Sequence, residues 1–199
     1  MALVIVDTGC ANLSSVAFAF ERLGASPRIT AISDEIKSAQ RVILPGVGSA
    51  PFALQNIAKK NLSATLKSLE QPVLGICLGM QLLFETVSEG GTKSDGLGLI
   101  SGGVDLLDTG SLPSPHMGWN QLAFETDDPI TSGLENGAYA YFVHSFAAPV
   151  SDATVASAQH GSKFSAIVRK GNVWGCQFHP ERSSATGSKI LENFLKVSV

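Results

Sequence analysis

A single cysteine between two glycines, in the segment 75–79, constrains the fold of this chain more than any other feature. The segment reads Gly-Ile-Cys-Leu-Gly, with apolar Val73 and Leu74 before it and a mostly apolar run over 80–84 after it. An apolar strand that passes through such a turn into a helix forms a nucleophile elbow, here with sulfur in place of the usual serine oxygen. We therefore expect Cys77 at a helix N-terminus, where the dipole and free N–H groups favour a thiolate and a developing oxyanion.

A second motif, far downstream, favours a catalytic Cys77 over the alternative of a buried structural cysteine. His179, Pro180 and Glu181 follow a strand predicted over 173–178. Residues i and i+2 of an extended chain face the same way, so Glu181 can orient the imidazole of His179. The three residues together predict a triad of nucleophile, general base and orienting acid.

The first half of the chain alternates between strand-like and helix-like segments. Strands are predicted over 3–6, 28–32, 41–44 and 73–76, and helices over 12–23 and 52–69, the second with a break near Asn61. This alternation favours an α/β fold with three layers, in which a mostly parallel sheet is flanked by helices. The first strand, Leu-Val-Ile-Val, is apolar throughout, as is typical of strands covered on both faces.

From Gly98 onward, glycines and prolines separate short strand-like pieces. Strands are predicted over 104–107, 121–124 and 138–146, which suggests an antiparallel extension of the same sheet, and a final helix over 181–196. Neither repeats nor linkers interrupt the pattern. We expect one domain over residues 1–199.

Composition excludes several classes of function. A formal net charge of -3 gives no reason to expect nucleic acid as a partner, although a local basic patch stays possible. The apolar run at the N-terminus stops at Asp7, too early for a signal peptide or a membrane span. Cys10, Cys77 and Cys176 are scattered and odd in number, so we expect neither a disulfide framework nor a zinc ribbon, and a cytoplasmic location.

The loop Pro45-Gly46-Val47-Gly48 follows a predicted strand and admits three interpretations. As a phosphate loop it lacks the third glycine of the dinucleotide pattern, where Pro51 stands. As an oxyanion donor, its glycine N–H could approach a substrate carbonyl closely. The third interpretation is an ordinary turn between a strand and a helix.

Three further residues were weighed as metal ligands or bases. Cys176 and His179 are three apart, so on one strand they point to opposite faces and cannot share an ion; Cys176 is expected in the core. His144 competes with His179 as the base but has no acid near it in sequence, so it ranks second. His160 is expected in a solvated turn. We predict no metal and no cofactor.

The motifs resemble those of the class I, triad-type glutamine amidotransferases. The elbow and Phe-His-Pro-Glu carry this resemblance, and Pro-Gly-Val-Gly, His-Met-Gly-Trp-Asn over 116–120 and Tyr-Phe-Val-His-Ser-Phe over 141–146 narrow it. Within that class the chain is similar to glutaminase subunits of imidazole glycerol phosphate synthase, in histidine biosynthesis. The resemblance spans nearly the whole chain and implies a flavodoxin-like fold.

The resemblance also implies a mechanism. The Cys77 thiolate would attack the carboxamide of glutamine, His179 would protonate the leaving ammonia and later activate water, and Glu181 would orient His179. The residues implied in oxyanion stabilisation and in glutamine binding are Gly46, Val47, Leu78, Gln81, Glu89, Ser145 and Phe146. The ammonia would pass to a (β/α)8-barrel cyclase subunit, the expected partner in a heterodimer, to form imidazole glycerol phosphate and an aminoimidazole carboxamide ribotide.

The partner face implied by the resemblance lies at the mouth of the site. Its residues are Asn12, Trp119, Asn120, Tyr141 and Arg182. Three positions depart from the usual family pattern: Arg182 replaces a common lysine, Phe146 a frequent tyrosine, and Cys10 another small residue. Since arginine and lysine differ in geometry, these departures bear on single partner contacts and leave the triad untouched.

Two other hypotheses differ in acceptor or in class. The same chemistry could serve a vitamin B6 synthase or an aminobenzoate synthase, whose relatives lack the combined Pro-Gly-Val-Gly and His-Met-Gly-Trp-Asn motifs. A catalytically silent scaffold that only binds a partner is the third hypothesis, and the intact triad argues against it. We also expect an oxyanion site that is only partly formed without the partner, because a glycine turn can flip.

Overall fold

The computed structural model describes residues 2–9 and 12–198, so the predicted role of Cys10 lies outside the described residues. Its main sheet has eight strands in the order β2-β1-β3-β4-β14-β13-β12-β9. The first five run parallel in the order 2-1-3-4-5 typical of flavodoxin-like folds, which confirms the predicted fold class. The five are β1 (Leu3–Val6), β2 (Pro27–Thr30), β3 (Arg41–Gly46), β4 (Val73–Cys77) and β14 (Val173–Cys176).

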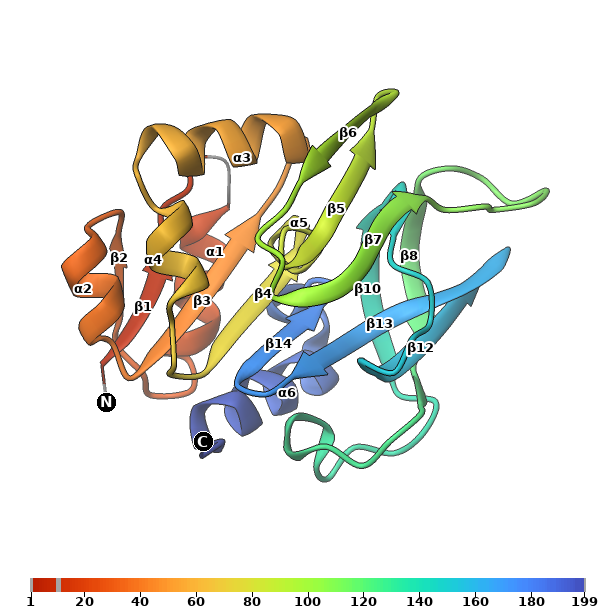
Figure 1. The fold of residues 1–199 in the computed structure, drawn as a ribbon. Coiled ribbons are helices and arrows are strands. Elements are labelled where there is room, and N and C mark those ends of the chain that lie inside the picture. The colour runs from red at the N-terminus through yellow and green to blue at the C-terminus, as the bar shows by residue number, and fades with distance from the viewer. Residues whose placement is uncertain (1, 10–11, 199) are drawn as a thin grey trace.

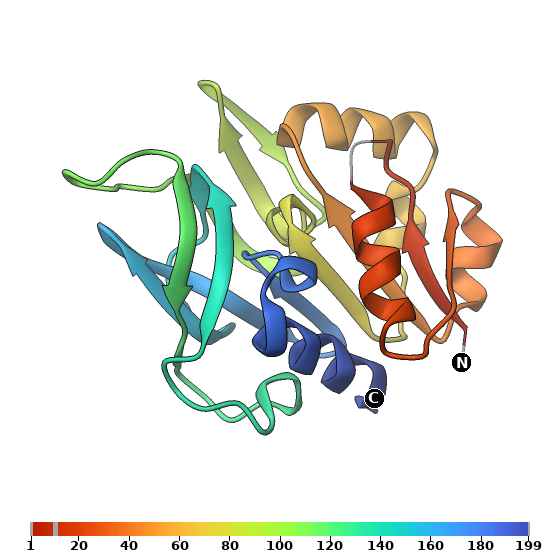
Figure 2. The same ribbon diagram turned by 180° about the vertical axis from the view of Figure 1, so that it is seen from behind.

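Helices cover both faces of this parallel half, and Figures 1 and 2 show one face each. Successive strand residues point to opposite faces, so in β1 Leu3 and Ile5 join one core while Val4 and Val6 join the other. The first core lies under α1 (Leu13–Glu21) and α6 (Ser184–Lys196); the second lies under α2 (Ser33–Ser38), α3 (Ala50–Lys59) and α4 (Ser63–Lys67). The uniformly apolar strands are therefore explained by burial on both sides.

The predicted helix over 52–69 is broken where the sequence suggested. Asn61 has φ 56°, a left-handed conformation that ends α3 before α4 begins. The helix after the elbow, α5 (Leu78–Gln81), is a single turn, and the chain then enters β5 (Phe84–Glu89). The last helix begins at Ser184, because a 3₁₀ turn, η2 (Pro180–Arg182), precedes it.

The predicted antiparallel extension exists, but different strands build most of it. The strands that extend the main sheet are β13 (Ser162–Lys170), β12 (Thr154–His160) and β9 (Ala123–Phe124). The pieces predicted over 104–107 and 138–146 belong instead to two small sheets. One pairs β8 (His116–Gln121) with β10 (Tyr139–His144); the other joins β11 (Phe146–Ala147), β7 (Ile100–Leu106), β5 and β6 (Thr92–Asp95).

These small sheets lie beside the C-terminal ends of β4 and β14 (Figure 1). Ligands of open parallel sheets bind at that edge, and here the small sheets supply walls around it. The described residues contain no helix long and apolar enough to cross a membrane.

Candidate active site

The elbow places Cys77 in a strained conformation at the end of β4. Cys77 has φ 52° and ψ −114°, and α5 begins at the next residue. A side chain at Gly79 would put its Cβ 1.8 Å from the carbonyl oxygen of Leu44, and one at Gly75 would meet the backbone of Met80 at 2.7 Å. The glycines are thus required by the close approach of α5 to β3 and β4, as the sequence predicted. Non-glycine residues rarely adopt positive φ, and such strain is typical of active sites.

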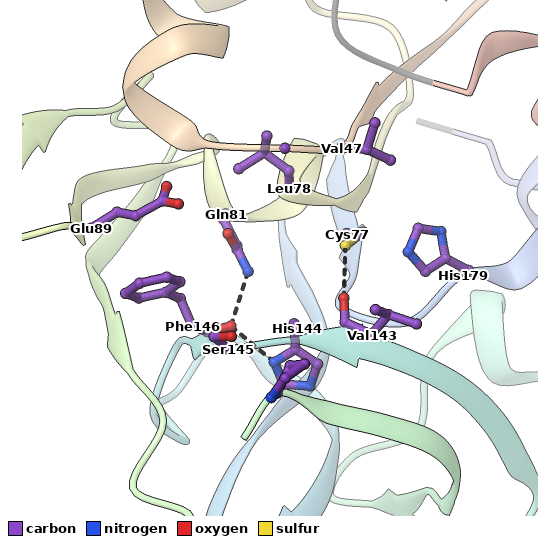
Figure 3. Close-up of a pocket in the computed structure, with 12 residues that line it drawn as sticks. Val47, Cys77, Leu78, Gln81, Glu89, Val143, His144, Ser145, Phe146 and His179 are labelled. Carbon is purple, nitrogen blue, oxygen red and sulfur yellow. Dashed lines mark hydrogen bonds between the residues drawn. The ribbon is translucent and has the colours of Figure 1, made fainter. Parts of the chain in front are cut away.

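His179 and Glu181 form the second part of the site, directly after β14. The Nδ1 atom of His179 lies 2.9 Å from Oε1 of Glu181, whose side chain is 3% exposed. The backbone N–H of His179 donates to the carbonyl of Tyr141 at 3.0 Å, which ties this turn to β10. Since Nδ1 is engaged by Glu181, Nε2 is the ring nitrogen left for the sulfur of Cys77. Figure 3 shows the two side chains facing one another.

Electrostatics favour a charged imidazole at His179. Burial lowers its pKa, but hydrogen bonds with Cys77 and Glu181 and the charges of both partners outweigh burial and raise the pKa to about 10. A protonated His179 beside Cys77 stabilises a thiolate, which is the nucleophilic form of cysteine. The pair can therefore attack an electrophilic carbon and then donate a proton to a leaving group.

A cavity of about 340 Å³ opens onto the sulfur. Its lining includes eight of the predicted catalytic and substrate-binding residues together: Val47, Cys77, Leu78, Gln81, Glu89, Ser145, Phe146 and His179. Glu181, which is bonded to Nδ1 of His179, is not part of this lining. The volume suits a molecule of amino-acid size.

Two glutamines link the cavity wall to the sulfur. The Nε2 atom of Gln81 donates to the carbonyl of Phe146 at 2.9 Å and to Oε1 of Gln177 at 3.0 Å. Gln177 is fully buried, and its own Nε2 lies 3.9 Å from the sulfur of Cys77. Because both N–H groups of Gln81 are used, its carbonyl oxygen is the group left to accept from a ligand. Gln177 was not among the residues predicted for the site, although it stands next to Phe-His-Pro-Glu.

Glu89 lies on the far side of the cavity from the triad (Figure 3). Its Oε2 accepts from the backbone N–H of Ala50, at the start of α3, at 2.6 Å. A carboxylate at a helix N-terminus is favoured by the dipole, so the side chain is held in place. Glu89 and the carbonyl of Gln81 together offer acceptors for an ammonium group.

The predicted oxyanion donors are near the sulfur. Leu78 opens α5, and Val47 lines the cavity with 39% of its surface exposed. Gly46 pairs with Cys77 in the β3–β4 register, so the loop that follows β3 runs beside the elbow. Gly46 and Val47 also line a smaller void with Asn12 and Glu181.

Of the five predicted partner-facing residues, two lie on the β8–β10 ribbon, two lie at α1 and η2, and the fifth, Asn120, points inward. On the outer face of the β8–β10 ribbon, Trp119 and Tyr141 are register partners with ring centroids 5.9 Å apart, and Trp119 is 52% exposed. Asn12 caps α1, and Arg182 is exposed in η2. The side chain of Asn120 points the other way, because its amide donates to His116 and to the carbonyl of Gln159. Alternation along β8 places Asn120 on the inner face, which the sequence interpretation had not taken into account.

Of the two histidines ranked below His179, His144 has no acid beside it, as expected, and only His160 lies elsewhere than predicted. His144 lines the cavity but is held by Phe146 and His116, not by an acid. His160, expected in a solvated turn, is only partly exposed and stacks on His116 with centroids 4.3 Å apart. Pro115 and Val143, which were not among the predicted site residues, also line the cavity, and the carbonyl of Val143 lies 3.8 Å from the Cys77 sulfur.

Cys176 lies fully buried in the core, where burial and the charges of Glu181 and Asp128 raise the pKa of its thiol. This position agrees with the prediction that Cys176 is a core residue. Over the described parts of the chain, no three His, Cys, Asp or Glu side chains are grouped so as to hold a metal ion.

The chain matches the family described as "Glutamine amidotransferase class-I" over residues 4–197. It therefore belongs to the class I glutamine amidotransferases. It is 50% identical, over 98% of both chains, to "Imidazole glycerol phosphate synthase subunit HisH 1" of Vibrio vulnificus (strain YJ016). It is 54% identical to "Imidazole glycerol phosphate synthase subunit HisH" of Colwellia psychrerythraea, covering 98% of this chain and 92% of that one.

Solved structures share the fold at much lower identity. A chain described as "glutamine amidotransferase" superposes with a TM-score of 0.74 at 18% identity, covering 97% of each chain. "PurLQS from Thermotoga maritima" gives 0.71 at 23% identity, covering 98% of this chain and 97% of that one. These structural similarities confirm the predicted fold.

Proposed function

We propose that this protein is the glutaminase subunit of an imidazole glycerol phosphate synthase, acting in histidine biosynthesis. The observation that carries the proposal is one arrangement: Cys77 on a strained elbow, beside the His179–Glu181 pair, at a cavity lined by Gln81 and Glu89. The identity to the HisH subunits over almost the whole chain supports the choice of acceptor reaction.

The first step is attack on the side-chain carboxamide of glutamine. The Cys77 thiolate adds to the carbonyl carbon, and the C–O electron pair moves onto the oxygen. Backbone N–H groups of Leu78 and of the Gly46–Val47 turn stabilise this oxyanion. The α-ammonium group lies between the Gln81 carbonyl and Glu89, and the α-carboxylate lies at the backbone of Ser145 and Phe146.

Collapse of the intermediate gives a thioester. The imidazolium of His179 gives its proton to the leaving nitrogen, the C–N bond breaks and ammonia departs. Neutral His179 then takes a proton from water, which adds to the thioester carbon, and the Cys77 thiolate leaves with glutamate as the product. Glu181 keeps Nδ1 protonated and orients the ring in both half-reactions.

Ammonia passes to a (β/α)8-barrel cyclase subunit, which we propose as the heterodimer partner. We place the partner-binding surface on the ribbon formed by β8 and β10, because this ribbon exposes more than half of each of three large side chains, Met117, Trp119 and Tyr139. Aromatic and methionine side chains are enriched at protein interfaces. Arg182 and Asn12 extend the same surface around the triad. A catalytic thiolate and free cysteines fit the reducing cytosol, where we place the reaction.

Replacement of the nucleophile tests the chemistry. Cys77→Ala, assembled with the cyclase, is expected to release no ammonia from glutamine, while the complex still forms product from added ammonium salts. Cys176→Ala is the matched control and is expected to retain glutaminase activity, because that thiol lies in the core. Glutamine consumption by Cys77→Ala would refute the nucleophile assignment.

Addition of the cyclase tests whether the partner activates the glutaminase. If the Gly46–Val47 turn completes the oxyanion site only in the complex, glutaminase turnover rises when the cyclase is added. Equal turnover with and without the cyclase would remove the regulatory part of the proposal and leave the chemistry intact.

A further inference from the structure

Two buried histidines face one another across the inner side of the β8–β10 ribbon. His116 and His144 are register partners, and Nδ1 of His116 lies 3.0 Å from Nε2 of His144. Both are at most 6% exposed. One of these two nitrogens must carry the proton and the other must accept it, so the direction of the bond depends on the groups at either end.

Asn120, at the first end of this series of hydrogen bonds, determines which ring nitrogen of His116 carries the proton. The Oδ1 of Asn120 accepts from the backbone N–H of Gln121, and its Nδ2 donates to the carbonyl of Gln159. Both partners are backbone groups with a single possible role, so the amide orientation of Asn120 is determined. Its second Nδ2 hydrogen then points at Nε2 of His116, 3.2 Å away. Nε2 must accept, and in the neutral ring the proton lies on Nδ1.

Phe146, at the second end, independently gives the same direction for the hydrogen bond between His116 and His144. Nδ1 of His144 lies 2.9 Å from the carbonyl oxygen of Phe146, which can only accept. His144 therefore carries its proton on Nδ1, and its Nε2 is the acceptor for His116. A chain of hydrogen bonds therefore runs from Asn120 through His116 and His144 to Phe146, and every donor in it faces an acceptor.

We infer that His116 is a positioning residue for glutamine binding, acting through His144 on the carbonyl of Phe146. That carbonyl also accepts from Gln81, which lines the cavity. The hydrogen bonds from Asn120 to Phe146 hold Phe146 and Gln81 at one end of the proposed glutamine site. No residue from Asn120 to Phe146 in this series is itself hydrogen-bonded to the triad. The inference therefore rests on the proposed function and concerns affinity, not the chemical step.

The surroundings of both rings favour the neutral forms that this chain requires. Burial, with the charge of His160, lowers the pKa of His116 to about 4. Burial lowers the pKa of His144 to about 3, against the opposing bond to Phe146 and together with the charges of His116, His160 and His179. If either ring were protonated on both nitrogens, one of its N–H groups would face the N–H donor of its neighbour.

Replacement of His116 in the full chain, assembled with its cyclase, tests the inference. His116→Phe keeps an aromatic ring for the stacked Phe142 and removes the Nδ1 donor. The KM for glutamine is expected to rise about tenfold, as for the loss of one buried hydrogen bond, with kcat within about twofold. His116→Asn restores an N–H close to the Nδ1 position and is expected to recover most of the affinity.

A matched control separates hydrogen bonding from packing. Phe164 contacts both rings, with centroids 5.6 Å from His116 and 4.9 Å from His144, but makes no bond in the chain. Phe164→Leu is expected to lower the melting temperature and leave the KM unchanged. An equal rise in KM for Phe164→Leu and His116→Phe, or a fall in kcat alone, would overturn the positioning role.

A second readout needs no enzyme activity. The chain has four histidines, so ¹⁵N spectra of the free protein can assign each ring. His116 and His144 are expected as neutral Nδ1–H tautomers at pH 7, although free histidine prefers Nε2–H. An Nε2–H tautomer or an imidazolium at either residue overturns the inference. Absence of glutaminase activity in the wild type would instead refute the proposed function, while the tautomers would still decide the direction of the chain.

Discussion

At the scale of single residues, Glu181 controls the proton on His179. Its bond of 2.9 Å to Nδ1 and its charge work with Cys77 to raise the pKa of that imidazole, while burial alone would lower it. The imidazolium therefore persists through neutral pH and above, and is available to protonate the leaving carboxamide nitrogen, which departs as ammonia. This behaviour follows from two side chains that the sequence places two positions apart.

The variant Glu181→Gln removes the charge and is expected to lower the pKa of His179. The alkaline limb of the kcat/KM profile for glutamine is then expected to move to lower pH by about one to three units, the usual effect of losing a close opposite charge. Glu192→Gln on α6, a partly exposed position paired with Lys196, is the control and should leave the profile in place. An unchanged alkaline limb in Glu181→Gln would mean that Glu181 does not act through His179.

The triad could be predicted from sequence because each member belongs to a local motif with its own geometry. Cys77 is identified by its flanking glycines, and His179 and Glu181 by an extended tripeptide. Gln177 and His116 could not be found in this way. Their roles depend on contacts with Cys77 and His144, which are distant in sequence, and no local pattern encodes those contacts.

At the scale of elements, the elbow depends on how closely α5 approaches β3. A Cβ at Gly79 would lie 1.8 Å from the carbonyl oxygen of Leu44, so α5 would have to move. Gly79→Ala is expected to lose glutaminase activity and to lower the free energy of unfolding by about 3 kcal/mol or more, as overpacking of a core does. Urea unfolding measures this. Gly103→Ala, which meets only the hydroxyl of Thr86 at 2.7 Å, should cost less; equal costs would contradict the account of the elbow.

The loop before η1 (Pro129–Thr131) is held by one buried carboxylate. Asp128 accepts from the N–H of Ile130, from Nε1 of Trp174 and from Arg169. Asp128→Ala leaves the buried indole N–H without its acceptor and is expected to cost about 3 kcal/mol of stability. Chemical denaturation measures the loss, with the exposed neighbour Asp127→Ala as the control. Equal effects of the two substitutions would refute the role assigned to Asp128.

The central strands of the parallel half could be predicted from their apolar sequences, because both of their faces are buried, whereas the short helix α2, with Ile36 as its one buried residue, was not predicted. The second half was harder to predict. The strand over 138–146 is real, but its partner is β8 rather than the main sheet, and pairing of this kind depends on packing that composition does not reveal. The long strands β12 and β13 were not predicted, since polar residues such as Ser157, Gln159 and Lys163 interrupt their apolar pattern.

At the scale of the whole molecule, the buried histidines make stability depend on pH in two opposite ways. His116 and His144 have pKa values of about 4 and 3, below the ordinary 6.5. The neutral rings of His116 and His144 stabilise the fold above about pH 6.5. This contribution is lost as the pH falls below 6.5 and through their folded-state pKa values of about 4 and 3. The pKa of His179 is raised to about 10, so its contribution is present below pH 6.5 and is lost as the pH rises through 10.

The acid side can be measured with urea unfolding at a series of pH values. Between pH 6.5 and 4 the wild type is expected to lose stability more steeply than His116→Phe, which has one fewer buried histidine to protonate. Parallel curves for the two proteins would show that His116 takes up no extra proton on unfolding.

The whole molecule brings one sulfur, one imidazole and one acid to the C-terminal edge of a parallel sheet, beside a cavity of amino-acid size. This arrangement requires that glutamine becomes attached to the protein during turnover. Rapid acid quench of the enzyme–cyclase complex with glutamine, followed by peptide mass spectrometry, tests that requirement most directly. We predict a glutamyl group on the peptide containing Cys77 and none on the one containing Cys176. Ammonia release without any acyl group on Cys77, under conditions in which thioesters survive, would contradict the account.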